Sequence, residues 1–408
     1  MDILIVSHFG STYSENDNDR FLYLAKMLKD EYQVEIVTSS FCHEKKNHRK
    51  KTEYKWPFSV TFLDEIGYKK NICLKRFLSH FIWGINLRKY LKRRKKPDVI
   101  YCAVPSLTGP YFVSKYCKKN NVKFIIDVQD LWPEAFELVF NIPILSKIIY
   151  APFNVVANHI YKRADSICAV SETYAERAMK NNKKCKNKNV VFLGTDLHLF
   201  DTCNEETSYK KNGKDEFWIA YCGTLGSSYD LTTVIKSLYL LKQRGEKEAK
   251  LIVIGDGPLM SKFENLANSL EINCEFTGRL PYNEMCSLLK KCDITVNPIM
   301  QGAAQSIINK HADYLASGLP MVSTQDNVEF NKLMDEYKFG IKCSNGNENE
   351  IVSSILKLMH DDDLRVVLGK NARICAEEKF DRNTSYKLLT NAILNEDGGD
   401  GELQRNTK

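Results

Sequence analysis

Glycines follow two predicted strands in the second half of the chain, and a predicted helix comes after each loop. They are Gly223, with Thr224 beside it, after strand 218–222, and Gly255 and Gly257 after strand 251–254. A glycine at a strand-to-helix turn lets backbone N–H groups approach an anion, and the helix N-terminus adds a partial positive charge. The loops therefore indicate phosphate binding. Ordinary turns explain them equally well, since Asp230 could cap the first helix and Asp-Gly-Pro is a common turn sequence.

Polar side chains gather after a third predicted strand, 294–296. They are Gln305, Ser306, Asn309, Lys310 and Asp313, on or near the first turns of a helix predicted over 309–317. Such a set could hold a sugar, two phosphates and a ribose. In a purely structural interpretation Asn309 caps the helix and Asp313 is solvated, which requires every polar group in the set to be incidental.

A carboxylate follows a strand in the first half of the chain. Asp130 comes a short loop after the predicted strand 124–126 and is a candidate for catalysis or for contact with an acceptor. An aspartate before Pro133 and Glu134 could also simply start a helix.

Two series of strands and helices must position these residues. Short β-branched or aromatic runs alternate with amphipathic stretches, which predicts an α/β fold with mainly parallel sheets. The runs lie at 3–6, 34–38, 60–63, 99–101, 124–126 and 167–170, and again at 218–222, 251–254, 274–277, 294–296 and 321–323. Two doubly wound domains would place ligands at the carboxyl edges of both sheets, in a cleft between the domains.

The domain boundaries follow from composition. The first domain is predicted over 1–200, a polar linker over 201–216 and the second domain over 217–378. A last helix, 379–394, is expected to pack back on the first domain, and 395–408 is too polar to pack.

Composition sets limits on the class of protein. The 408 residues are 43% hydrophobic and 27% charged, which is typical of a soluble globular protein. Thirteen cysteines without a CxxC pair match neither a disulfide framework nor a zinc site and favour a reducing, cytosolic compartment. The start, MDILIV, is a poor signal peptide, and no apolar run is long enough to span a membrane.

One stretch carries a concentrated positive charge. Between Lys69 and Lys96 there are eleven Lys and Arg and no Asp or Glu, more than the net charge of +7, so the rest of the chain is acidic overall. Apolar residues from Leu74 to Ile85 repeat at three and four and predict one helix stripe, which in the simplest interpretation packs on the sheet. The charge indicates an anionic membrane surface as a partner. Nucleic acid is the rival partner and is not expected, because no nucleic-acid-binding motif accompanies the charge.

Several segments together resemble a known enzyme family. GTLG, GDGP, FTGRLP and NKHADYLASGLPMV, with DLWPE, VSE and GTD in the first half, look like bacterial family 4 retaining glycosyltransferases of the GT-B fold, in the same order. The resemblance extends from Met1 to about Leu394. It implies two Rossmann-like domains facing across a cleft, a helical carboxyl-terminal tail, and transfer from a nucleotide sugar without a metal or other cofactor.

The resemblance also implies roles for individual residues. Gly223 and Thr224 would meet the diphosphate, Arg279 would lie beside the base, and 305–313 would hold the donor sugar and ribose. Gly255 and Gly257 would also bind donor, and Gly10 stands where relatives have a glycine pair facing the substrates.

This chain departs from the family pattern at two places. Many relatives have two glutamates at the places of Gln305 and Asp313, and a Lys or Arg where this chain has Ser227 and Ser228. Lys310 is therefore our first candidate for stabilising the leaving diphosphate, with Arg279 and the helix N-terminus at 306–309 as the alternatives.

These observations lead to one function and two alternatives. We expect a retaining transferase that uses a UDP-sugar and a glycan or polyprenyl-diphosphate-linked acceptor in capsule, O-antigen or exopolysaccharide synthesis, peripheral on the inner face of the membrane. The alternatives are a GT-B sugar-nucleotide epimerase and a basic binding protein without catalysis.

Overall fold

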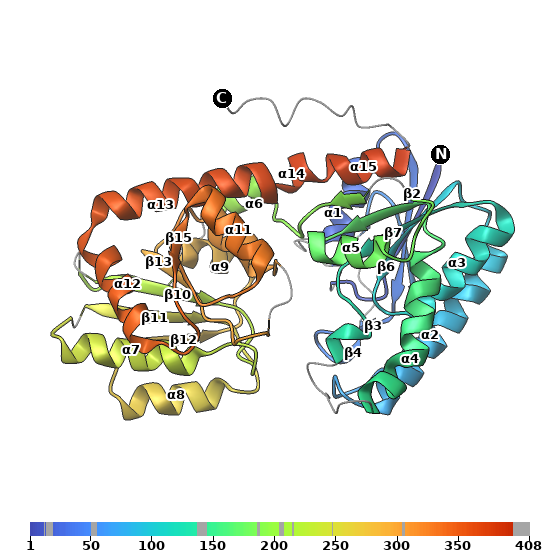
Figure 1. Ribbon diagram of the computed structural model, residues 1–408. Helices are drawn as coiled ribbons and strands as arrows, with labels where there is room; N and C mark the ends of the chain where they lie inside the picture. Colours follow the sequence, from blue (N-terminus) through green and yellow to red (C-terminus); the bar gives the residue numbers. More distant parts are fainter. Residues whose placement is uncertain are drawn as a thin grey trace. The chain divides into compact units, whose positions relative to one another are not determined.

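The computed structural model describes most of the chain as two compact units. The described residues are 1–11, 13, 19–49, 55–136, 145–185, 188–203, 208–213, 216–246, 248–303 and 307–394. The first unit contains Met1–Phe192 and the chain from Ser385 onward, and the second contains Leu193–Thr384. Each unit is an α/β domain around a parallel sheet (Figure 1).

The first unit has a seven-stranded sheet in the order β5-β2-β1-β6-β7-β8-β9, with every pair parallel. The strands are β1 (Asp2–Val6), β2 (Gln33–Ser39), β5 (Ser59–Leu63), β6 (Val99–Val104), β7 (Lys123–Val128), β8 (Ser166–Ala169) and β9 (Lys188–Val190). A short antiparallel pair, β3 (Phe41–Cys42) and β4 (Asn47–His48), follows β2. Sequence patterns predicted six of the seven sheet strands and missed the three-residue β9.

Helices connect these strands. They are α1 (Arg20–Leu28), α2 (Leu74–Arg93), α3 (Thr108–Asn120), a 3-10 turn (Glu134–Phe136), α4 (Leu145–Tyr161) and α5 (Glu172–Met179). The apolar core includes fully buried Ile3, Ile5, Leu24 and Tyr101.

The predicted apolar stripe of α2 was wrong. Leu74 and Leu78 are exposed by 87% and 52%, whereas Trp83, Leu87 and Leu91 are buried. A Cβ on Gly84 would lie 2.7 Å from Thr108 Cγ2, so the absence of a side chain there allows α3 to pack closely. The helix therefore packs through a face centred on its second half.

The last helix belongs to the first unit. α15 (Lys387–Leu394) packs against α1 (Figure 1). Tyr386, Leu389 and Ile393 are buried in the same core as β1. The chain thus passes between the units twice, at 192/193 and at 384/385.

The second unit has a six-stranded parallel sheet in the order β12-β11-β10-β13-β14-β15. The strands are β10 (Phe217–Cys222), β11 (Ala249–Ile254), β12 (Cys274–Gly278), β13 (Ile294–Asn297), β14 (Met321–Ser323) and β15 (Gly340–Lys342), the last of which was not predicted. The helices are α6 (Leu197–Thr202), α7 (Leu231–Gln243), α8 (Met260–Ser269), α9 (Tyr282–Leu289), α10 (Lys310–Ala316), α11 (Val328–Tyr337), α12 (Glu348–His360), α13 (Asp362–Cys375), a π-helical turn (Ala376–Phe380) and α14 (Arg382–Ser385).

The observed boundary between the units differs from the predicted one. The second unit begins at Leu193, before the predicted linker 201–216, and ends at Thr384 rather than 378. Asp201 pairs with Arg373, and Lys211 pairs with Asp293, all within the second unit. The segment lacks apolar periodicity but is attached by charged side chains, which composition alone does not reveal.

Local capping explains several helix starts. Asp230 Oδ1 accepts from Thr233 N at 3.1 Å, and Asp361 Oδ1 accepts from Leu364 N at 2.8 Å. The acidic run 361–363 is thus a helix start, and within the described ranges no group of three His, Cys, Asp or Glu could hold a metal ion. All thirteen cysteines are free thiols, and the described helices include none with the length and apolarity to cross a bilayer.

Candidate functional site

The second unit has its topological switch point between β10 and β13. The chain continues from β10 to β11 on one side, while β13 pairs with β10 on the other. Open α/β sheets bind ligands outside the carboxyl ends of the strands at such a point. The Gly223 loop leaves β10 at this place, and α10 follows β13.

Three predicted glycines pack two loops together. A Cβ on Gly255 would lie 1.9 Å from Gly223 O, and one on Gly257 would lie 2.5 Å from Leu225 O. Backbone hydrogen bonds from Gly223 N to Ile254 O and from Leu225 N to Asp256 O join the same loops. Gly255 and Gly257 therefore have a structural role in bringing the β10 and β11 loops into backbone contact.

Lys310 lies beside the Gly223 loop in an aromatic setting. Its Nζ is 4.2 Å from the Tyr221 ring centre and 3.9 Å from that of Tyr229, and it is 3.3 Å from where a Gly223 Cβ would stand. Lys310 is only 8% exposed, and its Nζ finds no hydrogen-bond partner in the described part of the chain. Burial lowers the pKa of Lys310 to about 7. This buried nitrogen at the switch point is suited to receive an anion.

Asp313 is held by a tyrosine. Tyr282 donates its hydroxyl hydrogen bond to Asp313 Oδ1 at 2.9 Å, and the same hydroxyl is 2.6 Å from Thr195 Oγ1. Burial raises the pKa of the Asp313 carboxyl, although the Tyr282 hydrogen bond opposes this change. One oxygen of the predicted ribose acceptor is thus already engaged within the unit.

The remaining predicted donor residues lie nearer the surface. Thr224, Arg279 and Asn309 are exposed. Asn309 occupies the N-cap position of α10 without a side-chain capping hydrogen bond, so the capping interpretation does not explain it. Gln305 and Ser306 lie outside the described residues.

A buried polar network supports α10 and was not predicted. Asn297 Nδ2 donates to Ser323 Oγ and Gln325 Oε1, both at 3.0 Å, and lies 3.2 Å from His311 Nε2. His311 also stacks on Phe330 at 4.4 Å. The sequence patterns also did not predict the aromatic pair around Lys310. Tyr221 has the pattern of an ordinary strand residue, and Tyr229 lies in a polar turn.

The first unit has its own switch point between β1 and β6. His8, after β1, bonds Ser106 Oγ, after β6, through Nδ1 at 2.6 Å, and Glu65 Oε1 through Nε2 at 2.9 Å. Glu65 also accepts from Ser39 and Ser79. Although burial acts in the opposite direction, the hydrogen bonds lower the pKa of Glu65 to about 2.

Two predicted residues follow the carboxyl ends of strands in the first unit, Gly10 after β1 and Asp130 after β7. Gly10 O accepts from Arg49 Nη2 at 2.6 Å, and a Cβ on Gly10 would lie 2.5 Å from the Tyr13 ring. Asp130 accepts from Leu131 N at 2.9 Å and from Trp132 Nε1 at 3.1 Å, and burial raises its pKa. Asp130 is therefore a positioned carboxyl group and not a helix cap.

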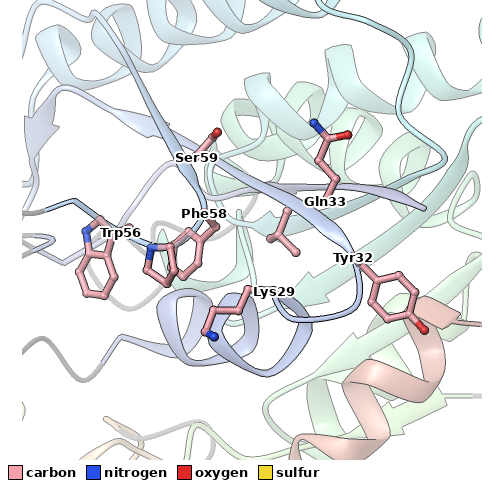
Figure 2. A pocket seen from close by; sticks show the side chains of 8 residues that line it. Lys29, Tyr32, Gln33, Trp56, Phe58 and Ser59 are labelled. Carbon is pink, nitrogen blue, oxygen red and sulfur yellow. The ribbon is translucent and has the colours of Figure 1, made fainter.

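A hollow of about 440 Å³ lies elsewhere in the first unit, lined by Lys29, Tyr32, Trp56 and Phe58 (Figure 2). Gln33 and Ser59, at the amino ends of β2 and β5, also line it. Substrates of this fold bind at the opposite, carboxyl ends, so we do not place the reaction there.

Part of the chain is similar to a known family of proteins. Residues 204–374 match the model of group 1 glycosyl transferases. This segment, less than half of the chain, is similar to a group 1 glycosyl transferase domain. The matched segment includes the Gly223 loop, Lys310 and Asp313, whereas Gly10 and Asp130 lie outside it.

Relatives extend the likeness beyond the group 1 domain. An uncharacterized glycosyltransferase of Methanocaldococcus jannaschii is 24% identical over 254 residues, which cover 61% of this chain and 64% of that protein. The match thus spans just under two thirds of the relative's length.

Solved structures share the whole fold. HepE of Anabaena in complex with UDP superposes with a TM-score of 0.70 at 13% identity, covering 97% of this chain and 100% of that one. Sucrose-phosphate synthase of Thermosynechococcus elongatus gives a TM-score of 0.73 at 13% identity, covering 97% and 98%. The fold is GT-B, as the sequence motifs predicted.

Proposed function

We propose that this protein is a retaining glycosyltransferase that takes its sugar from a UDP-sugar. The observation that carries the proposal is Lys310, a buried nitrogen without a hydrogen-bond partner among the described residues, beside the Gly223 loop of the group 1 domain. The structural neighbour HepE was solved with UDP, which supports a uridine nucleotide as the donor.

The proposed chemistry follows from where charge develops. When the bond between the sugar and the diphosphate breaks, negative charge grows on the β-phosphate, and a positioned cation stabilises that charge. We assign this role to Lys310 and assign backbone N–H groups at Gly223 and Thr224 to the diphosphate. Arg279 and Asn309, with Gln305 and Ser306, are the proposed contacts to base and sugar, and no metal is required.

The first unit is proposed to bind the acceptor. Asp130 is the carboxyl group that we expect to contact the acceptor hydroxyl, because its raised pKa favours taking a proton there. Asp313 is proposed to accept from the ribose in exchange for a hydrogen bond that it receives from Tyr282 or Thr195 within the unit.

A membrane-bound acceptor in surface polysaccharide synthesis is the finer part of the proposal. Nine of the eleven cations between Lys69 and Lys96 are exposed. Arg94 is half-buried and forms ion pairs with Asp2 and Glu35. Exposed apolar side chains accompany them on two helices that meet through Phe77 and Phe153. These side chains are Leu74, Leu78, Phe81, Ile148, Ile149 and Val155. Cations beside apolar side chains suit an anionic lipid surface, which supports a peripheral location at the inner leaflet.

A donor panel tests the proposal. The full chain is incubated with UDP-, GDP-, ADP- and dTDP-sugars. The unfolding temperature is measured with each one, and products formed without an acceptor are followed by proton NMR. Stabilisation by a UDP-sugar with slow release of UDP supports a transferase. A new sugar nucleotide formed without acceptor would indicate the epimerase, and stabilisation without turnover, even with membrane-lipid acceptors, would indicate a binding protein.

A further inference from the structure

Arg76 in the first unit lies on a platform of aromatic rings. Its guanidinium carbon is 4.8 Å from the ring centre of Trp132, 5.7 Å from that of Tyr68 and 5.9 Å from that of Phe9. Its Nη1 donates to Asn71 O at 2.9 Å, while its buried Nε has no hydrogen-bond partner in the described ranges. The rings fix the position of a cation that retains hydrogen-bonding capacity.

A second cation stands beside the same platform. Lys46 Nζ is 5.1 Å from the Tyr68 ring centre and bonds Asn71 Oδ1 at 2.5 Å and His43 Nδ1 at 3.3 Å. Lys46 has a left-handed backbone, φ 53°, in the turn between β3 and β4. Among the described residues, neither Lys46 nor Arg76 forms an ion pair with a carboxylate.

The groups in contact with the two cations are uncharged. Burial, followed by the charges of Lys46 and Arg76, lowers the pKa of His43 to about 3, so this imidazole is neutral. The nearby carboxylates bond other groups, since Glu65 accepts from His8 and Asp130 accepts from Leu131 N and Trp132 Nε1. The charge of Asp130 acts on Arg76, but within the described ranges no carboxylate is in direct contact with either cation.

The cluster lies where the first unit should bind a ligand. Phe9 follows the carboxyl end of β1, and Trp132 follows that of β7, so the platform borders the switch point between β1 and β6. Two adjacent cations without a carboxylate in direct contact match a phosphoryl dianion or a diphosphate better than a single carboxylate, and a guanidinium presents the fork geometry that phosphate oxygens accept.

We propose that Arg76 and Lys46 form a phosphoryl-binding subsite for the acceptor in the first unit. This assignment rests on the proposed transferase function, and it narrows the acceptor to one that carries a phosphate or diphosphate near the hydroxyl that is glycosylated. A lipid-linked diphosphate and a soluble sugar phosphate share this chemistry.

The test measures pyrophosphate binding by calorimetry with the donor site blocked. The full chain is first saturated with UDP, and if UDP does not bind, Lys310→Met serves as the background, so that a failure of the donor proposal remains separate from this one. Arg76→Gln and Lys46→Gln are each compared with Lys119→Gln, which removes an exposed charge from α3 in the same unit, outside the basic stretch.

We expect at least a tenfold weaker pyrophosphate affinity in Arg76→Gln and in Lys46→Gln, with Lys119→Gln near the parent protein. Equal affinities in all three variants would overturn the subsite. Competition by farnesyl diphosphate in detergent and by glucose 1-phosphate then distinguishes a lipid-linked from a soluble acceptor. The unfolding midpoint of each variant is measured alongside, and Lys46→Gln, in a surface turn, keeps the test valid if Arg76→Gln does not fold.

Discussion

The side-chain nitrogen of Lys310 lies 3.9 Å from the centre of the Tyr229 ring, and no carboxylate pairs with it in the described part of the chain. The negative faces of Tyr229 and Tyr221 partly replace water around the ammonium. They do not neutralise it, so a bound diphosphate would supply the missing counter-charge.

This arrangement predicts that donor binding depends on pH. With a pKa of about 7 in the free protein, half of the Lys310 side chains are neutral near that pH. Since a diphosphate favours the charged form, binding takes up a proton, and affinity for UDP falls as pH rises above 7, by up to about tenfold per pH unit. Calorimetry from pH 6 to 9, in buffers of different ionisation enthalpy, measures both effects. Lys310→Arg keeps its charge and should show a flatter profile; an identical slope would contradict the prediction.

Removing the charge should separate turnover from stability. We expect Lys310→Met to lower turnover by about 10²- to 10³-fold, in line with the loss of one transition-state contact. The unfolding midpoint in urea should stay the same or rise, because an unpaired buried amine is replaced by an apolar side chain of similar length. If Lys310→Met lost stability but kept its turnover, we would conclude that Lys310 has only a structural role.

Replacing Asp313 should weaken donor binding more than replacing its hydrogen-bond partner, Tyr282. We expect Asp313→Ala to raise the half-saturation concentration for donor, by a loss on the order of 1 to 3 kcal/mol for a hydrogen bond to a charged group. Tyr282→Phe removes the partner but leaves the carboxylate and should alter donor saturation less. Initial rates at varied UDP-sugar decide between them, and equal effects would mean that Asp313 serves only to hold Tyr282.

Gly255 should tolerate no side chain. Gly255→Ala places a Cβ 1.9 Å from Gly223 O and requires a positive φ of 148°, so we expect a loss of stability of about 3 kcal/mol or more. Gly245→Ala is the control, because it has a positive φ of 96° with open space around it, and should lose only about 1 kcal/mol. Urea unfolding compares them, and equal losses would show that backbone conformation alone matters.

The basic helix should direct the protein to anionic vesicles. Each cation near such a surface contributes about 1 kcal/mol, so replacing Arg88, Lys89, Lys92 and Arg93 by Glu should abolish sedimentation with anionic vesicles. High salt should release the parent protein. Leu74→Ser with Leu78→Ser tests the apolar contribution separately. Binding to neutral vesicles in high salt would show that the apolar side chains dominate, and binding to neither vesicle would leave the charge as a solvated face.

Patterns local in sequence predicted the sheets well, because each buried strand is a short run of apolar residues. They also located the loops that meet at the β10–β13 switch point, since loops after parallel strands gather at one edge. The face that α2 buries could not be read in the same way. Its first half is apolar but exposed, and the close approach at Gly84 depends on a helix that begins at residue 108.

The surroundings of the site residues could not be predicted from the sequence either. Lys310 was identified by its position in a motif, whereas its pKa depends on Tyr221 and Tyr229, about ninety and eighty residues earlier. Gly255 matched a phosphate loop, but its contact is with another loop. Arg76 counted only as one of eleven cations until the fold placed Phe9, Tyr68 and Trp132 around it.

Tyr386, Leu389 and Ile393 complete the core of the first unit. The ribosome therefore synthesises the residues of that core in two separate segments, one before and one after the second unit. The whole of 193–384 is synthesised between them, which takes about 10 to 40 seconds at 5 to 20 residues per second. During this interval the surface that α15 will cover, including part of α1, faces solvent on the nascent chain. We therefore expect the first half of the protein to expose apolar surface during translation and to depend on chaperones until α15 is available to cover it.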